Sequence, residues 1–472
     1  MDYSDGFIET TKLLAGGKLY DISTADADRH YDSILGVVSD HHPKWGVTES
    51  WTIPGLAVKH FETGYSEGKA GGTLNISAYE TRLNGTLDGS TIAGTLQRTS
   101  DERASGSTLA IDLNNNNLFG KQDVVFNKDA ALTDLSFDEA LPRKADGSTE
   151  AAALMIDAGL FKRSGISNVS IKTNGAVSLQ KEADLDLPTD GHLSLSAAGF
   201  DIQGAISAPS GDVSLKPVSV NDTLLPSAIT LGDSAVIDVA GLWVNDFLDS
   251  RQGRALGLIA NDGGSVTLTS EQGDLRLEQG SRIDADGGGL LDSGAKITAG
   301  QGGSISLTAA THDGGGLSSS LVLNGELSAY GIVEGGSLSL GSSEVVIGAA
   351  ADAPVRADAT TTPLILAPGF FRQGGFADYS VTSNLYGLKV ADKVKLEPQQ
   401  QNLLLSDNVP GQASGSRIED FSRTVVLPDS TRKAANLSLS FSELLAQNRN
   451  EALTIGQGAT INTDAGAKVQ LN

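Results

Sequence analysis

Gly263-Gly264-Ser265-Val266-Thr267-Leu268 opens residues 263–347, a stretch in which the same phrase occurs three times. The phrase returns 39 positions later as Gly302-Gly303-Ser304-Ile305-Ser306-Leu307, and after 33 more as Gly335-Gly336-Ser337-Leu338-Ser339-Leu340. In each copy apolar residues alternate with Ser or Thr, and this period of two indicates a strand with one buried face. The glycine pair supplies backbone freedom for a sharp turn before the strand. Because so short a strand is not stable alone, its repetition predicts that like units stack on one another.

A second phrase alternates with the first and reads apolar, any residue, Gly, any residue, apolar, any residue, small. Two phrases in a fixed order predict one coil of a solenoid, with the sequence strand, corner, strand, corner. The smallest clean period is 20 residues, because the phrase at Gly191–Leu195 returns at Gly211–Leu215. The longer spacings indicate a coil of similar size plus a surface loop. Copies of the second phrase are found at Leu83–Gly89, Ile202–Ala208, Leu277–Ala285 and Leu323–Ala329.

These repeats predict an all-β chain, a parallel β-helix with irregular excursions. Stacked coils would place strands about 4.8 Å apart, with Val, Ile and Leu inside and Ser, Thr and charged residues facing water. A string of immunoglobulin-like sandwiches is the competing fold, but its period is about 100 residues and its strands form antiparallel hairpins. The observed spacings of 20 to 39 residues favour the β-helix.

The pattern divides the chain into four parts. Residues 1–70 are expected to be an irregular segment that packs on the solenoid, with a helix turn and a strand between Phe7 and Ile22 and an extended run from Trp45 to Pro54. Residues 71–367 are the solenoid, with an excursion near 101–165 that includes a short helix over 150–163. Residues 368–440 are a second excursion, and the solenoid resumes at 441–472. The second excursion carries an aromatic cluster of Phe370, Phe371, Phe376 and Tyr379.

Composition narrows the function classes. Gly accounts for 56 of the 472 residues, aromatic residues for 5%, and there is no Cys, which excludes disulfides and thiolate metal sites. The net charge of −24 disfavours nucleic acid and anionic lipid as partners. No stretch approaches the roughly 18 apolar residues that span a membrane. The N-terminus has no signal-peptide pattern, and both ends stop abruptly, so we expect a piece of a longer protein.

Longer phrases resemble a known family, the filamentous haemagglutinin-type exoproteins exported by two-partner secretion in Gram-negative bacteria. The most specific phrase is Ile229–Asp246; Tyr65–Leu74, Gly369–Phe376 and the Gly-Gly-Ser repeats add to it. The resemblance spans about residues 30–472 and implies a right-handed β-helix. It also implies secretion through an outer-membrane pore, a place at the cell surface, and work as an adhesin or biofilm-matrix protein. The family's secretion domain carries Asn-Pro-Asn motifs, which are missing here, so the chain is expected to come from the body of the fibre.

Two groups of residues resemble parts of metal sites. The densest is His41-His42 with His30, His60, Asp26, Asp28 and Asp40, whose ligand types suit zinc but whose spacings match no standard motif. Asp284-Ala285-Asp286-Gly287 resembles part of a calcium loop, yet it lacks the further Asp or Asn and the closing Glu. A polar loop and a solvated turn are the favoured interpretations, so we predict no metal and no cofactor.

Other candidate sites are equally open to plain structural explanations. Asn75, Asn84, Asn168, Asn221 and Asn436 each begin an Asn-x-Ser/Thr sequon, which chance also produces in a chain this rich in Asn, Ser and Thr. Trp45, Trp51 and Tyr65 are more easily explained as packing the N-terminal segment than as stacking on a sugar. No pair of carboxylates stands out as the acid and base of a glycosidase, and no nucleophile or phosphate-binding motif is found.

The sequence therefore predicts a non-enzymatic segment of a secreted surface adhesin or matrix fibre. It would act as a rigid spacer, with a polysaccharide or a host or neighbouring-cell surface as its ligand, and with unknown ligand-binding residues before residue 70 or after residue 368. A β-helix polysaccharide lyase or hydrolase is the alternative. An Asp/Glu cluster in a groove with aromatic subsites would favour that alternative.

Overall fold

The computed structural model describes residues 1–472 apart from 1, 4–5, 11, 22–24, 26–28, 36, 43, 46, 53–57, 63, 115–119, 130–135, 137, 311–318, 354–361 and 443–451. The chain is mostly β and forms two compact units. The smaller unit comprises residues 1–69 and 93–97, and the larger unit comprises residues 70–92 and 98–472.

The smaller unit is built from antiparallel strand pairs rather than irregular chain. β1 pairs with β9, β2 with β8, β3 with both β4 and β5, and β6 with β7. The expected helix turn after Phe7 is wrong, because β2 and β3 occupy that segment, while the strand expected at Lys18 is confirmed as β4. The run from Trp45 contains a true strand, β7. The strands are β1 (Asp2–Tyr3), β2 (Gly6–Thr10), β3 (Lys12–Ala15), β4 (Lys18–Asp21), β5 (Ser33–Leu35), β6 (Val37–His42), β7 (Val47–Thr52), β8 (Val58–Glu62) and β9 (Tyr65–Ser66).

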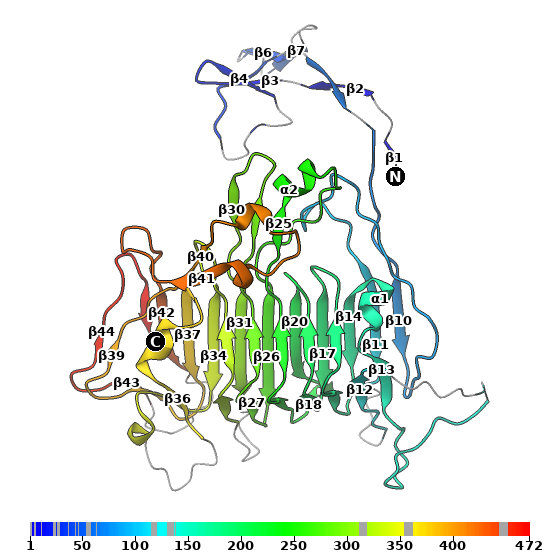
Figure 1. Ribbon diagram of the computed structural model, residues 1–472, viewed down its shortest axis with the longest axis vertical. Coiled ribbons are helices and arrows are strands. Elements are labelled where there is room, and N and C mark those ends of the chain that lie inside the picture. Colours follow the sequence, from blue (N-terminus) through cyan, green and yellow to red (C-terminus); the bar gives the residue numbers. More distant parts are fainter. Residues whose placement is uncertain are drawn as a thin grey trace. The chain divides into compact units, whose positions relative to one another are not determined.

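The larger unit contains an eleven-stranded sheet in which every pair of neighbours is parallel, and its strands stand side by side in Figure 1. Successive strands follow chain order, so each strand is added at the edge left by the one before it. In order they are β10 (Thr73–Ser77), β11 (Ser107–Asp112), β14 (Ile166–Lys172), β17 (His192–Ala197), β20 (Asp212–Pro217), β26 (Ser265–Glu271), β31 (Ser304–Ala310), β34 (Ser337–Ser342), β37 (Asp378–Ser383), β42 (Asn436–Phe441) and β45 (Val469–Leu471).

Two further parallel sheets receive the chain between these strands. From β14 the chain passes to the seven-stranded sheet, then to the five-stranded sheet, then back to β17, and this rotation repeats. The seven-stranded sheet is β13 (Leu154–Asp157), β12 (Val124–Asn127), β15 (Val177–Leu179), β18 (Gly199–Ile202), β23 (Ala228–Leu231), β27 (Leu275–Leu277) and β32 (Leu321–Leu323). The five-stranded sheet is β16 (Asp184–Asp186), β19 (Ala205–Ser207), β24 (Val236–Asp238), β28 (Arg282–Asp284) and β33 (Glu326–Ser328).

Toward the C-terminus two smaller sheets take over this role. The first is a four-stranded parallel sheet and the second a parallel pair of strands. Their strands are β36 (Leu364–Leu366), β35 (Val345–Ile347), β38 (Leu388–Val390) and β43 (Leu453–Ile455), and then β39 (Lys395–Leu396) and β44 (Thr460–Ile461).

The register of the long sheet confirms the repeats seen in the sequence. Ser265 pairs with Ser304 and Ser304 with Ser337, which are the 39- and 33-residue spacings of the Gly-Gly-Ser phrase. His192 pairs with Asp212 at the 20-residue spacing. Because side chains alternate along a strand, this register aligns all the apolar positions on one face. They are buried in a single core, for example Val266, Leu268, Ile305, Leu307, Leu338 and Leu340.

The structure gives a different reason for glycine at the paired positions than the sharp turn that the sequence predicts. Gly263, Gly264, Gly302 and Gly303 do not have positive φ, so the turn does not require a left-handed residue. Instead a Cβ on Gly264 would lie 1.9 Å from the Gly211 oxygen, and one on Gly303 would lie 2.0 Å from the Gly264 oxygen. Glycine is required because the backbones of neighbouring segments approach too closely for any side chain.

Segments where the repeat breaks in the sequence also join the sheets. Residues 101–165 supply β11, β12 and β13, and residues 368–440 supply β37, β38 and β42. The predicted helix over 150–163 is wrong for most of its length: β13 replaces it, and only α1 (Leu160–Ser164) is helical. The aromatic cluster lies in the core rather than in an excursion, since Phe371, Phe376 and Tyr379 are buried and their rings pack edge to face.

A second apolar cluster lies in a platform made of three excursions from the sheets. Trp243 is fully buried there, and its ring meets Phe421 edge to face at 5.4 Å. The other members of the cluster are Leu291, Leu403, Val409 and Ile418. The platform elements are β25 (Trp243–Asn245), α2 (Asp246–Arg251), β29 (Gly289–Leu291), β30 (Ile297–Ala299), β40 (Asn402–Leu405), η4 (Val409–Gly411), η5 (Ile418–Phe421) and β41 (Ser422–Val425).

No helix in the described part of the chain is both long and apolar enough to cross a membrane.

Candidate functional sites

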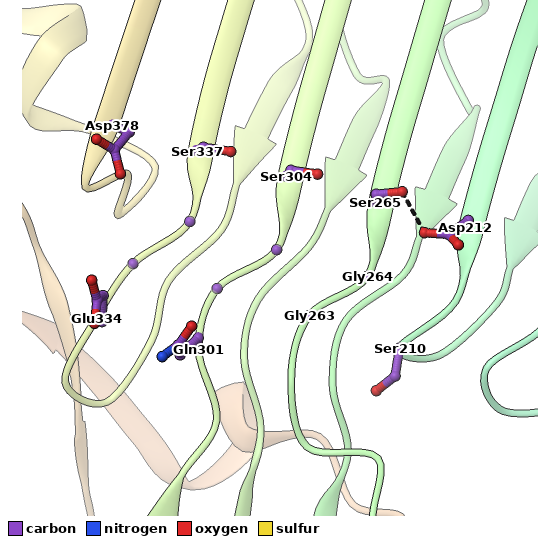
Figure 2. Close-up of a pocket in the computed structure, with 14 residues that line it drawn as sticks. Ser210, Asp212, Gly263, Gly264, Ser265, Gln301, Ser304, Glu334, Ser337 and Asp378 are labelled. Carbon is purple, nitrogen blue, oxygen red and sulfur yellow. Dashed lines mark hydrogen bonds between the residues drawn. The ribbon is translucent and has the colours of Figure 1, made fainter. Parts of the chain in front are cut away.

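A polar groove crosses the eleven-stranded sheet where the glycine pairs meet the strands, and we call it the glycine groove. Figure 2 shows its floor, with Ser265, Ser304 and Ser337 in a row at the starts of β26, β31 and β34. This part has a volume of about 450 Å³, and a second hollow of about 490 Å³ shares Ser337 and Asp378 with it. Polar side chains lining the two hollows include Ser210, Asp212, Gln301, Glu334, Asp378, Asn436, Ser438, Lys468 and Gln470.

Side-chain contacts link the groove residues Asp212 and Asp378 to neighbouring strands. The Ser265 hydroxyl donates to Asp212, and His192 Nδ1 lies 2.7 Å from the other oxygen of that carboxylate. The hydrogen bond from His192 holds the pKa of Asp212 below its usual range, and the same contact raises the pKa of His192. At the far end, Asn436 Nδ2 donates to Asp378 at 2.7 Å.

An acidic cavity of about 810 Å³ lies between the sheets and the platform. Asp286 and Glu419 line it, and Asp284 lies beside them, so that carboxylate oxygens of the three residues fall within 4.8 Å of one another. Asp284 ends β28 and Asp286 follows it by two residues, whereas Glu419 comes from η5 of the platform. Arg282 joins the two parts, because its guanidinium contacts Asp284 and donates to Glu419 at 2.7 Å.

Burial dominates the electrostatics of this cavity. Asp284 is 3% exposed and Asp286 is 6% exposed, so the solvated turn expected at Asp284–Gly287 is wrong. Burial raises the pKa of Asp286 to about 8, and the negative charge of Asp284 adds to the rise. Burial also raises the pKa of Asp284, although the positive charge of Arg282 opposes it. At neutral pH Asp286 is therefore mostly a neutral acid and can donate a proton.

The two aspartates are held by a hydrogen bond between them and by one from the segment that follows β33. The Asp286 N–H donates to Asp284 Oδ1 at 3.0 Å, and the Tyr330 N–H donates to Asp286 Oδ1 at 2.7 Å. The cavity also has aromatic and apolar walls, including Phe370 and Leu327. Of the described residues, these three acids form the one group with metal-ligand spacing, and they are the Asp284 and Asp286 of the calcium-like fragment joined by a distant Glu419.

The other sequence candidates gain little from the structure. Asp26 and Asp28 lie outside the described residues, His30 is exposed, and the side chains of Asp40, His41 and His60 are not described. His42 lies 3.7 Å from Glu49, in a hairpin pair. Trp45 is 71% exposed, so the expectation that it packs the N-terminal segment is wrong; the Trp51 side chain is not described, and Tyr65 is half-buried.

The sequons divide into two sets. Asn75, Asn84 and Asn221 are exposed, whereas Asn168 and Asn436 are half-buried. Asn168 donates to the Gly106 oxygen at 3.0 Å, and Asn436 donates to Asp378. A glycan on either half-buried residue would break these contacts, which leaves the exposed three as the accessible acceptors.

No protein-family model, curated protein or solved structure matches this chain.

Proposed function

We propose that the larger unit is a right-handed parallel β-helix and that the chain is a segment of a secreted adhesin or biofilm-matrix fibre of the filamentous haemagglutinin type. The observation that carries the proposal is the continuous parallel order of the eleven-stranded sheet from β10 to β45. Each coil adds one strand, and neighbouring strands lie about 4.8 Å apart, so the fold lengthens by repetition and suits a stiff spacer. The resemblance of Ile229–Asp246 to that family supports the same function.

The proposal places the protein at the bacterial cell surface, after export through an outer-membrane pore partner. Antibodies against residues 98–472 should label intact cells, and the label should disappear when the pore partner is removed. Label that persists without the pore, or that requires permeabilised cells, would contradict this localisation.

A polysaccharide panel tests the adhesin function itself. The protein is incubated with bacterial and host polysaccharides, and binding and chain cleavage are scored separately. Binding without cleavage is the expected result. Cleavage that is lost on replacing one carboxylate would overturn the non-enzymatic assignment.

A polysaccharide hydrolase is the second candidate, favoured by one observation, the acidic cavity. Retaining glycosidases use two carboxyl groups about 5–5.5 Å apart, and one of them must be protonated at working pH. Asp286 is the proton donor that this mechanism needs, and Glu419 at the cavity wall is the exposed carboxylate. Asp286→Asn would then abolish cleavage and leave binding intact. The adhesin ranks first because Asp286, the proton donor, is only 6% exposed, and because Glu419 is already engaged by Arg282 at 2.7 Å.

A further inference from the structure

We propose that the glycine groove binds a linear polysaccharide of neutral or amino-bearing sugars, laid across the strands of the eleven-stranded sheet. The inference rests on the adhesin function proposed above and adds to it the binding surface and the ligand class. Its evidence is the length of the groove, its exposed chemistry and its charge.

The length of the groove selects a chain-like ligand. The two hollows share Ser337 and Asp378, and their linings run from Asp212 on β20 to Gln470 on β45. This distance covers seven strands, and six steps of about 4.8 Å give a groove about 29 Å long. A small molecule would occupy one or two coils, whereas a polymer would contact a similar set of groups on each coil.

The backbone of the groove floor is already satisfied. The Ser265 N–H donates to Gly211 O at 2.9 Å, the Ser304 N–H to Gly264 O at 3.0 Å and the Ser337 N–H to Gly303 O at 3.0 Å. An extended peptide that binds by adding a strand needs free main-chain groups, and these are not free. What remains is a repeated set of hydroxyl, amide and carboxylate side chains, which are the groups that pair with sugar hydroxyls.

The glycine pairs keep this floor low. A Cβ on Gly336 would lie 1.9 Å from the Gly303 oxygen, so no residue with a side chain fits there. Figure 2 shows the result: the glycines before Ser265, Ser304 and Ser337 carry no side chain, while Gln301 and Glu334 flank them. A sugar ring can therefore approach the backbone at the glycine pairs before β26, β31 and β34, between flanking side chains such as Gln301 and Glu334.

The charge of the groove excludes polyanions. Asp212, Glu334 and Asp378 line it, against the single cation Lys468. Two nearby bases moderate this charge: Lys433 contacts Glu334 at 3.1 Å, and His192 contacts Asp212. The balance remains negative, so nucleic acid and uronic-acid polymers are repelled, while neutral sugars are accepted and amino sugars are attracted.

The test uses the 472-residue chain and three hexasaccharides, which are built from N-acetylglucosamine, from its deacetylated form glucosamine, and from galacturonic acid. Calorimetric titration should show binding of the N-acetylated and deacetylated hexasaccharides and no binding of the galacturonic acid hexasaccharide. Added salt should lower the affinity for the deacetylated hexasaccharide alone. Ser304→Trp places a bulky ring in the groove at an exposed position and should remove binding of both ligands. Thr454→Trp, at an exposed position on β43 in another sheet, is the matched control and should bind as wild type.

Asp378→Asn separates charge from shape. It should lower the affinity for the deacetylated chain about tenfold, because roughly one charge-assisted contact is lost. The affinity for the N-acetylated chain should stay nearly unchanged. Failure of all three sugars to bind, equal loss in Thr454→Trp, or tightest binding of the uronate would each overturn the inference. In those cases the polysaccharide and labelling tests of the adhesin still stand by themselves, whereas cleavage of the panel would overturn the adhesin whatever the groove variants do.

Discussion

Gly303→Ala tests why the coils need glycine at their corners. The new Cβ would lie 2.0 Å from the Gly264 oxygen, about 1 Å closer than real Cβ contacts allow. Because φ at Gly303 is not positive, the alanine carries no conformational penalty of its own, and the clash alone must be relieved. The strands have to move apart by a comparable amount.

The magnitude follows from two terms. Overpacking of a tight site costs about 1–3 kcal/mol, and movement of β31 away from β26 loses the Ser304 N–H to Gly264 O hydrogen bond, worth about 0.5–1.5 kcal/mol. The free energy of unfolding should therefore fall by about 2–4 kcal/mol. Urea unfolding followed by circular dichroism measures it. Hydrogen exchange should localise the loss to β26, β31 and β34, since repeats interact mainly with their neighbours.

Gly72→Ala is the matched control, because Gly72 closes the glycine pair of an earlier copy, just before β10, and its Cβ would meet nothing within 4 Å. It should change the stability by less than about 1 kcal/mol, and in the stabilising direction. The close-approach explanation is refuted if Gly303→Ala unfolds like wild type, or if the two alanines are equally damaging.

Three further predictions concern the platform, the acidic cavity and a buried ion pair. Trp243→Ala should lower the free energy of unfolding by about 3–5 kcal/mol, because the ring is fully buried against Phe421. Trp45 is exposed, so Trp45→Ala should lower it by less than about 0.5 kcal/mol. Calorimetry of both variants checks this. Asp286 has a raised pKa in the folded chain, so between about pH 4 and 8 only the unfolded state loses its proton and stability falls as pH rises, by at most about 1.4 kcal/mol per unit. Urea midpoints against pH should thus be flatter in Asp286→Asn, and parallel curves would contradict the assignment. Arg98→Ala should lower the free energy of unfolding by about 3–5 kcal/mol, because it leaves the buried Asp246 carboxylate, which Arg98 contacts at 2.7 and 2.8 Å, without its partner. Arg163→Ala should lower it by less than about 1 kcal/mol, because the pair of Arg163 with Asp157 is exposed. Equal losses in the two variants would refute the burial argument.

The register between repeats was predictable because each short phrase encodes it locally. Each Gly-Gly-Ser phrase carries its own strand and its own buried face, so equal phrases had to pair, as Ser265, Ser304 and Ser337 do. The position of the glycines was visible too, but not their reason, since close backbone approach depends on the neighbouring coil. The helix predicted over 150–163 failed because alanine propensity is weak beside a place in a parallel sheet, which β13 takes.

The acidic cavity was not predictable from the sequence. Asp284 and Asp286 lie in a Gly-rich fragment that looks like a surface turn, yet both are buried, and the platform helix η5 beside them lies more than a hundred residues away in the chain. Glu419 has no motif around it, and only folding brings it to Arg282. The one signal available was the pair of acids itself, and it is weak, because the register partners of Asp284 are Asp238 and Ser328.

The direct test of the stacked-coil architecture is a cysteine cross-link, which the absence of native Cys makes clean. Ser304→Cys with Ser337→Cys places thiols on directly paired residues of β31 and β34, within the Cα separation of about 4.4–6.8 Å that a disulfide spans. Ser304→Cys with Ser380→Cys is the control, because Ser380 lies two strands away on β37 and pairs with Ser339. The account predicts that mild oxidation of the folded protein links 304 to 337 and leaves 304 and 380 free. Linkage of 304 to 380, or failure of 304 to 337 in a folded protein, would contradict it.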